Sequence, residues 1–186
     1  MNTNLKPSST EAMQSLDTAH HFHPFTNHQA MHAEGGVRVI VSADGCWITD
    51  SEGHRTLDGM AGLWCVNIGY GRRELADTAR QQMLELPFYN TFFKSASVPT
   101  IELAARLSAL LPDGFEKVFF NNSGSEANDT VWRLVRGYWH LVGKPEKQII
   151  ISRDNAYHGS TVAAASLGGM PFMHAQAGLP IPGVVH

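Results

Sequence analysis

The stretch Phe119-Phe120-Asn121-Asn122-Ser123-Gly124-Ser125-Glu126-Ala127 decides the fold. The run 117–121 has the apolar character of a short buried strand, and the small polar residues after it predict a tight turn. A strong helix is expected over 125–139, because its apolar residues repeat along one face. A strand, a small-residue turn and a helix in direct succession indicate an α/β fold.

The turn at 122–125 is a candidate anion site. The first N–H groups of a helix have no partner within it, and the helix dipole favours negative charge there. Gly124 allows close backbone approach, and the hydroxyls of Ser123 and Ser125 can donate to phosphate oxygens. Ordinary capping, with Ser125 as the N-cap and Asn128 or Asp129 assisting, explains the same residues. A P-loop and a nucleophile elbow are excluded, because neither GxxxxGK[ST] nor Gly-x-Ser-x-Gly occurs here.

A second candidate segment follows the next apolar run. Residues 148–152 predict another buried strand, and Tyr157 and His158 come just after it. In a parallel sheet, ligands bind outside the carboxyl ends of the strands. We therefore expect Tyr157 and His158 to lie at the same edge as the turn at 122–125. The Tyr157 ring could stack there on a flat heterocycle, and a packed tyrosine in a turn is the alternative.

The first part of the chain has a different pattern. Asp44-Gly45 is a strong hairpin signal between two short β-rich runs, and a second turn at 51–53 completes a small antiparallel meander over about 37–58. Helices are expected over 9–19, 72–86 and 97–111, with a loop over 20–36. Helices that alternate with apolar strands after residue 71 indicate a mainly parallel sheet.

The composition is that of a globular protein, with 43% hydrophobic and 17% charged residues among 186. A net charge of −3 gives no reason to expect nucleic acid or a membrane surface as a partner. No apolar run approaches the ~20 residues that span a bilayer, and residues 1–14 lack the apolar core of a secretory signal. Cys46 and Cys65 are far apart and are expected to be buried, reduced thiols. We therefore expect a cytoplasmic protein.

Aromatic and histidine residues gather in loop-like segments. Aromatic side chains in loops can wall an apolar pocket, although they more often belong to a core. The histidines between residues 20 and 32 suggest a metal site, but no carboxylate or cysteine accompanies them at ligand spacing. The sequence therefore predicts no metal site.

Several motifs, in this order and spacing, resemble the class III pyridoxal-phosphate aminotransferases. Within that family they resemble the ω-transaminases, which pass amino groups from amines, diamines such as putrescine, or β-alanine to pyruvate. The resemblance begins near residue 15 and continues to the end of the sequence. It rests on His20-His21-Phe22-His23-Pro24-Phe25-Thr26, Asp58-Gly59-Met60-Ala61-Gly62-Leu63-Trp64-Cys65-Val66-Asn67, Gly69-Tyr70-Gly71, Leu86-Pro87-Phe88-Tyr89-Asn90, Asn122-Ser123-Gly124-Ser125-Glu126-Ala127-Asn128, Tyr157-His158-Gly159-Ser160-Thr161 and Ser166-Leu167-Gly168-Gly169-Met170.

The resemblance implies the fold of the type I pyridoxal-phosphate transferases, in incomplete form. Residues 1–65 would belong to the small domain with its meander, and residues 66–186 would form the first part of the cofactor-binding large domain. Pyridoxal 5'-phosphate would be bound by Ser123, Gly124, Ser125, Tyr157 and His158. The substrate pocket would be lined by Phe25, Trp64, Phe92 and Tyr157.

The resemblance also implies that no catalytic residue lies in this chain. The family's Schiff-base lysine would come after residue 186, and none of Lys6, Lys94, Lys117, Lys144 and Lys147 has its sequence context. We expect a C-terminally truncated fragment that is inactive alone and whose parent is a homodimer. A non-catalytic remnant of the same fold, which binds phosphate ligands or forms oligomers, is the alternative. A hydrolase that uses Ser125 and His158 lacks the elbow pattern.

Overall fold

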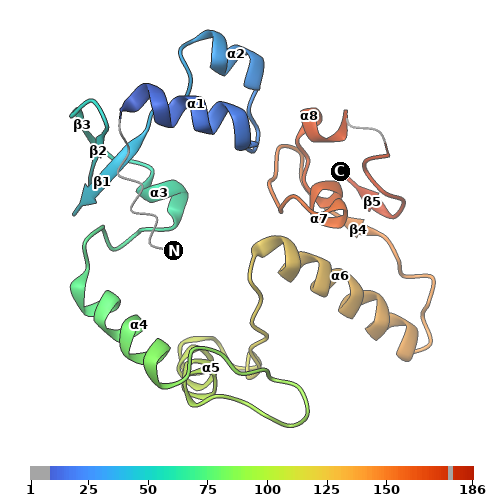
Figure 1. Ribbon diagram of the computed structural model, residues 1–186. Coiled ribbons are helices and arrows are strands. Elements are labelled where there is room, and N and C mark those ends of the chain that lie inside the picture. Colours follow the sequence, from blue (N-terminus) through green and yellow to red (C-terminus); the bar gives the residue numbers. More distant parts are fainter. Residues whose placement is uncertain (1–8, 176–177) are drawn as a thin grey trace. The chain divides into compact units, whose positions relative to one another are not determined.

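The computed structural model describes residues 9–175 and 178–186 (Figure 1). The chain divides into two compact units, the first ending at Tyr89 and the second beginning at Asn90. The expected division into a small and a large domain after residue 65 stays a prediction.

The first unit combines helices with a small antiparallel sheet. Its elements are α1 (Thr10–His20), α2 (His28–Ala33), β1 (Ile40–Asp44), β2 (Trp47–Asp50), β3 (Arg55–Leu57), α3 (Ala61–Trp64) and α4 (Arg73–Glu85). The side chain of Ser9 accepts a hydrogen bond from the Ala12 N–H and so fixes the start of α1. The segment 20–36, expected to be a loop, contains α2, which is capped by Asn27.

The expected meander is present. β1, β2 and β3 pair in chain order, each antiparallel to the next, as Figure 1 shows. The turn between β1 and β2 begins at Gly45, whose φ of 57° lies in the left-handed region that glycine adopts without a steric penalty. The Asp44-Gly45 signal in the sequence therefore identified the turn correctly.

The second unit contains the longest helix and a short parallel strand pair. Its elements are α5 (Val98–Leu110), α6 (Gly124–Leu141), β4 (Ile150–Ile151), α7 (Val162–Leu167), α8 (Pro171–His174) and β5 (Val184–Val185). β4 pairs with β5 in parallel, as the α/β pattern predicted. The strand expected at 117–121 does not form. A strand needs a neighbour to take its hydrogen bonds, and within the described residues no segment pairs with this one.

The buried apolar side chains of the described residues all lie in the second unit, where α7 packs against α6 and α8. They are Trp132, Ala164, Ala165, Leu167 and Met173. The prediction that both cysteines are buried was wrong, because Cys46 and Cys65 are exposed. Among the helices of the described ranges, none is both long and apolar enough to cross a membrane.

Candidate functional site

The N-terminus of α6 is capped by Ser123. Its side chain accepts a hydrogen bond from the Glu126 N–H at 3.2 Å, and the Glu126 carboxylate accepts one from the Asn122 N–H at 2.9 Å. The sequence interpretation that made Ser125 the N-cap was therefore wrong by two residues. Both serines can adopt that role locally, and the tertiary structure uses Ser125 for another contact.

That contact holds the loop after β4 against the start of α6. Ser125 Oγ accepts a hydrogen bond from the Ser160 N–H at 3.0 Å. One turn along the helix, Asn128 Nδ2 donates to the His158 carbonyl at 2.6 Å. Thr161 Oγ1 donates to Asp129 Oδ1 at 2.7 Å. The turn at 122–125 and the Tyr157–His158 segment are therefore brought together, although 30 to 35 residues separate the bonded pairs.

Asn128 and Asp129 are positioning residues that sequence analysis considered only as capping residues. Their signal is their spacing, because positions 125, 128 and 129 lie on one face of a helix at i, i+3 and i+4. Three polar side chains on one face at the start of an otherwise amphipathic helix indicate a bound loop as well as a cap.

Gly159 lets this loop approach α6 closely. Its φ is 127°, and a Cβ built there would lie 2.8 Å from Ser125 Cα and 2.9 Å from the Ala164 Cβ. No side chain fits in that space without moving the backbone of α6 or α7. The glycine in the Tyr-His-Gly-Ser segment is therefore required by the contact between loop and helix.

The loop is also fixed from its other side by Gly169, the second glycine after α7. The Asn155 N–H donates to the Gly169 carbonyl at 2.8 Å, and the Gly169 N–H donates to the Ala156 carbonyl at 3.0 Å. The Tyr157 side chain extends from this fixed backbone and is half exposed. Its hydroxyl lies 3.2 Å from Ser160 Oγ. A ring at this place can serve as a stacking platform, because its backbone is held on both sides.

The start of α6 can accept a phosphate group. Within the described part of the chain, no acceptor takes the backbone N–H of Gly124 or Ser125. A Cβ built at Gly124 would meet no atom within 4 Å, so the approach to these donors is open. Ser123 and Ser125 act as acceptors in their hydrogen bonds and keep their hydroxyl protons for donation. The donors therefore fit an anion with several acceptor oxygens.

In the first unit, Trp64 lies at the end of an unusual backbone segment. Ala61, Gly62, Leu63 and Trp64 all have a positive φ, between 49° and 66°. The left-handed region is unfavourable for residues with a side chain, so other contacts must hold this segment. Backbone strain of this kind is common at functional sites, which makes the position of Trp64 a candidate for a substrate contact.

Asp58 holds the segment. Its carboxylate accepts hydrogen bonds from the Met60 N–H, from the Gly62 N–H and from the Tyr70 hydroxyl, the last two at 2.7 Å. The Tyr70 hydrogen bond, followed by the Gly62 N–H, lowers the pKa of Asp58, and the same hydrogen bond raises the pKa of Tyr70. Sequence analysis assigned no role to either residue, although Asp58 stands in the quoted motif.

The other two candidate pocket residues lie in different units. Phe25 is in the loop before α2, with a φ of 50°. Phe92 is in the loop before α5, where its N–H donates to Asn90 Oδ1 and its ring centroid lies 6.2 Å from that of Phe93. Both side chains are largely exposed.

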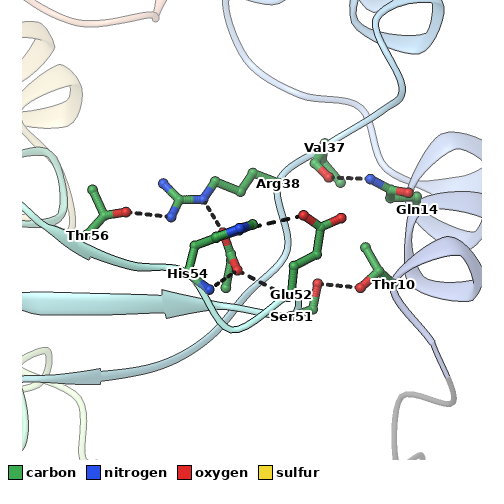
Figure 2. Close-up of polar contacts among 9 residues, drawn as sticks. Thr10, Gln14, Val37, Arg38, Ser51, Glu52, His54 and Thr56 are labelled. Carbon is green, nitrogen blue, oxygen red and sulfur yellow. Dashed lines mark hydrogen bonds and ion pairs between the residues drawn. The ribbon is translucent and has the colours of Figure 1, made fainter.

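A polar cleft of about 540 Å³ borders the meander in the first unit. Arg38, His54 and Thr56 line this cleft, and Figure 2 shows their polar contacts. Asp50 is 5% exposed and accepts from Arg38 Nε and from the N–H groups of Glu52 and His54. Desolvation raises the pKa of Asp50, but the Arg38 and backbone hydrogen bonds outweigh it and bring the pKa to about 2. These hydrogen bonds indicate that the Asp50 carboxylate has a structural role and stabilises the meander.

Comparison with known proteins shows which protein family the chain matches. Residues 29–186 match the profile of the family described as Aminotransferase class-III. The putrescine–pyruvate aminotransferase of Pseudomonas aeruginosa is 53% identical over 186 residues, which is 100% of this chain and 41% of that protein. The diaminobutyrate–2-oxoglutarate transaminase of Halomonas elongata is 41% identical over 155 residues, which covers 83% of this chain and 33% of that one.

Solved structures of ω-transaminases share the fold. A thermostable (S)-enantioselective ω-transaminase from Thermomicrobium roseum superimposes with a TM-score of 0.91 at 46% identity, over 96% of this chain and 40% of that one. The ω-transaminase from Pseudomonas jessenii in complex with PMP gives a TM-score of 0.90 at 42% identity, over 94% of this chain and 38% of that one. The chain therefore spans between a third and about two fifths of the length of these relatives.

Proposed function

Because the chain belongs to the class-III aminotransferase family, we propose that the protein carrying it moves an amino group from an amine, a diamine or an ω-amino acid to pyruvate. The relative that matches the whole chain is named for putrescine and pyruvate, which supports this choice of donor and acceptor. The fold is that of the type I pyridoxal-phosphate enzymes, represented here by an antiparallel meander and the first part of an α/β unit.

Class-III aminotransferases depend on pyridoxal phosphate, and the donors at the start of α6 fit its phosphate group. In this proposal the N–H groups of Gly124 and Ser125 and the hydroxyls of Ser123 and Ser125 bind the phosphate. Tyr157 stacks on the ring, and His158 supports it. The cofactor, when bound, supplies the carbonyl carbon through which an amino group passes between two substrates.

In this proposal, the side chains of this chain bind the cofactor and orient its ring. Ser125 has two tasks, because its oxygen holds the Ser160 N–H while its proton is available to the phosphate. This double contact couples the phosphate end of the site to the loop that carries Tyr157. The hydrogen bond from the Ser160 N–H to Ser125 Oγ is the observation that carries the proposal, because it ties the loop that carries Tyr157 to the start of α6.

The aromatic residues set the donor class in this proposal. The family resemblance assigns Trp64, Phe25, Phe92 and Tyr157 to the substrate pocket, where aromatic side chains would exclude water from the amine. Asp58 and Tyr70 position Trp64 through the left-handed segment. A pocket with apolar walls favours donors with an aliphatic or aromatic chain behind the reacting amine.

We also propose that the full-length protein is a cytoplasmic homodimer, and that the 186-residue chain alone does not transaminate. Many large apolar side chains of the chain are exposed, including those on α4, α5 and α6. Apolar surface of this extent requires cover from further polypeptide, whether from the same protein or from a second copy.

The test is alanine formation from pyruvate by the full-length protein with putrescine as donor. Alanine is expected with pyruvate, and glutamate formation with 2-oxoglutarate should be much slower. A preference for 2-oxoglutarate would reject the pyruvate assignment, and no transamination with any primary amine would reject the proposed function.

The Ser125→Ala substitution tests the proposed phosphate site at the start of α6 directly. It should weaken pyridoxal phosphate binding to the apoprotein about tenfold, because one phosphate donor and the support of the loop are lost together. Titration of the apoprotein, followed by cofactor absorbance, measures this. Ser42→Ala, on the exposed face of β1, is the matched control and should leave the affinity unchanged.

A further inference from the structure

A histidine and aspartate cluster lies at the end of α1, in the first unit. Asp17 Oδ1 is 2.8 Å from His21 Nδ1, and Asp17 Oδ2 is 2.8 Å from His23 Nε2. One ligand atom from each of the three residues lies within 4.8 Å of the other two. The sequence argument against a metal site was that no carboxylate accompanies the histidines, and Asp17 is that carboxylate.

The chain path explains why the cluster forms. Asp17 and His21 are four residues apart, so one helical turn places them on the same face. The helix ends at His20, and the reversed chain brings the His23 ring back over the last turn. The backbone N–H of His23 donates to His28 Nε2 at 2.8 Å, and the His28 ring stacks on Phe22. His23 is therefore held in place by contacts that leave its Nε2 directed to Asp17.

We propose that Asp17, His21 and His23 form a binding site for a divalent metal ion of the borderline class, such as Zn²⁺. Two imidazole nitrogens and one carboxylate oxygen are ligands that Zn²⁺, Ni²⁺ and Co²⁺ share, and three protein ligands leave further positions for water. The site does not depend on the proposed aminotransferase function.

The distances between the ligand atoms are compatible with a bound metal ion after movement of the side chains. Metal–ligand bonds of about 2.0–2.2 Å place neighbouring ligand atoms about 3.0–3.5 Å apart. The two aspartate–histidine pairs are already within a few tenths of an ångström of that spacing, and the two histidine nitrogens, which lie within 4.8 Å of each other, have to come closer. Binding replaces the imidazole protons that bridge to Asp17, so the ion occupies the place of two hydrogen bonds.

The site is open to solvent on one side. The His21 side chain is 60% exposed, whereas those of His23 and Asp17 are 20% and 15% exposed. An ion can enter past His21 and meet two ligands that are largely fixed. In this position it would join the C-terminal end of α1 to the loop that leads to α2.

Calorimetric titration of the full-length apoprotein with ZnCl₂ at pH 7.5 tests the proposal. We expect one site per chain with a Kd of about 10 μM or tighter. Cobalt should bind at the same site and give visible absorption bands of a nitrogen- and oxygen-ligated ion. Asp17→Asn and His23→Ala should each weaken zinc binding at least about tenfold.

His20→Ala is the matched control, because it removes an exposed histidine of the same helix that is not a ligand, and binding should be unchanged. Asp17→Asn preserves shape, and circular dichroism checks that each variant is folded. Two outcomes would overturn the proposal. One is the absence of a stoichiometric zinc site, which would leave the cluster as a hydrogen-bonded helix end. The other is zinc binding that persists in both ligand variants.

Discussion

The aspartates of the first unit and the loop after β4 in the second unit draw on hydrogen-bond partners at different distances along the sequence, although the first unit also has a long-range contact between Thr10 and Ser51. In the first unit, Asp17, Asp50 and Asp58 each collect hydrogen bonds from partners at most twelve residues away. In the second unit, the bonds that hold the loop after β4 to α6 span 30 to 35 residues.

The burial of side chains follows the same division. In the described residues of the first unit, the buried side chain is a carboxylate, Asp50. In the second unit the buried residues are small or apolar, with Ala164 and Ser166 at 0% exposure. A carboxylate that gathers donors from nearby residues can shape a turn without an apolar core, whereas the proposed phosphate site at the start of α6 depends on close packing between distant segments.

The largest effect is expected where the second unit is tightest. Gly159→Ala should lower the free energy of unfolding by about 2–3 kcal/mol, because the new Cβ meets Ser125 Cα in a backbone region that alanine avoids. Cofactor affinity should fall with it. Denaturant unfolding of the full-length apoprotein measures the first effect.

Gly137→Ala is the control for this prediction, because a Cβ there meets no atom within 4 Å on α6. It should stabilise the protein slightly, by up to about 1 kcal/mol. Equal changes in stability for Gly159→Ala and Gly137→Ala would show that the loop after β4 does not pack closely on α6. The close packing inferred for the second unit would then be wrong.

The next effect concerns the Asp50 anchor and its dependence on pH. The folded pKa of Asp50 is lowered from 3.8 to about 2, so the unfolded chain takes up the proton first as the pH falls. The ionised Asp50 carboxylate therefore stabilises the folded state fully above about pH 5, and this contribution is lost as the pH falls through 4 towards 2. The protection factors of the Glu52 and His54 amides, measured by hydrogen exchange and corrected for the pH dependence of the intrinsic rate, should fall over that interval.

Asp50→Asn should remove this pH-dependent step, because the variant carries no proton to titrate. Glu52→Gln, which removes an exposed carboxylate from the same turn, should retain it. A pH step that survives in Asp50→Asn would assign it to another carboxyl group.

The smallest effect is expected at Tyr70. Tyr70→Phe removes one of the hydrogen bonds to Asp58, while the Met60 and Gly62 N–H donors remain. Hydrogen exchange in the segment 58–66 should rise by about tenfold at most. Tyr89→Phe, at an exposed tyrosine, should not change it. No change in Tyr70→Phe would mean that the backbone donors alone hold the left-handed segment.

The sequence by itself determined the longer helices, the antiparallel meander and the family. Apolar periodicity located α1, α4, α5 and α6 to within one or two residues, and Asp44-Gly45 located the hairpin. These signals are local, because a helix or a two-residue turn is encoded within a few neighbouring residues. The ordered motifs around Ser123–Ser125 and Tyr157–His158 were enough to indicate class III, and the comparisons confirm it.

The tertiary structure decided how individual polar side chains are used. Ser123 and Ser125 are equally suited to cap a helix, and the loop carrying Ser160 leaves capping to Ser123. Asp17 joined the histidines only because the chain reverses after α1. The run 117–121 has the composition of a strand and lacks a partner among the described residues. A hydroxyl, a carboxylate or a strand edge can satisfy its hydrogen bonds in several ways, and the choice depends on which distant segment arrives beside it.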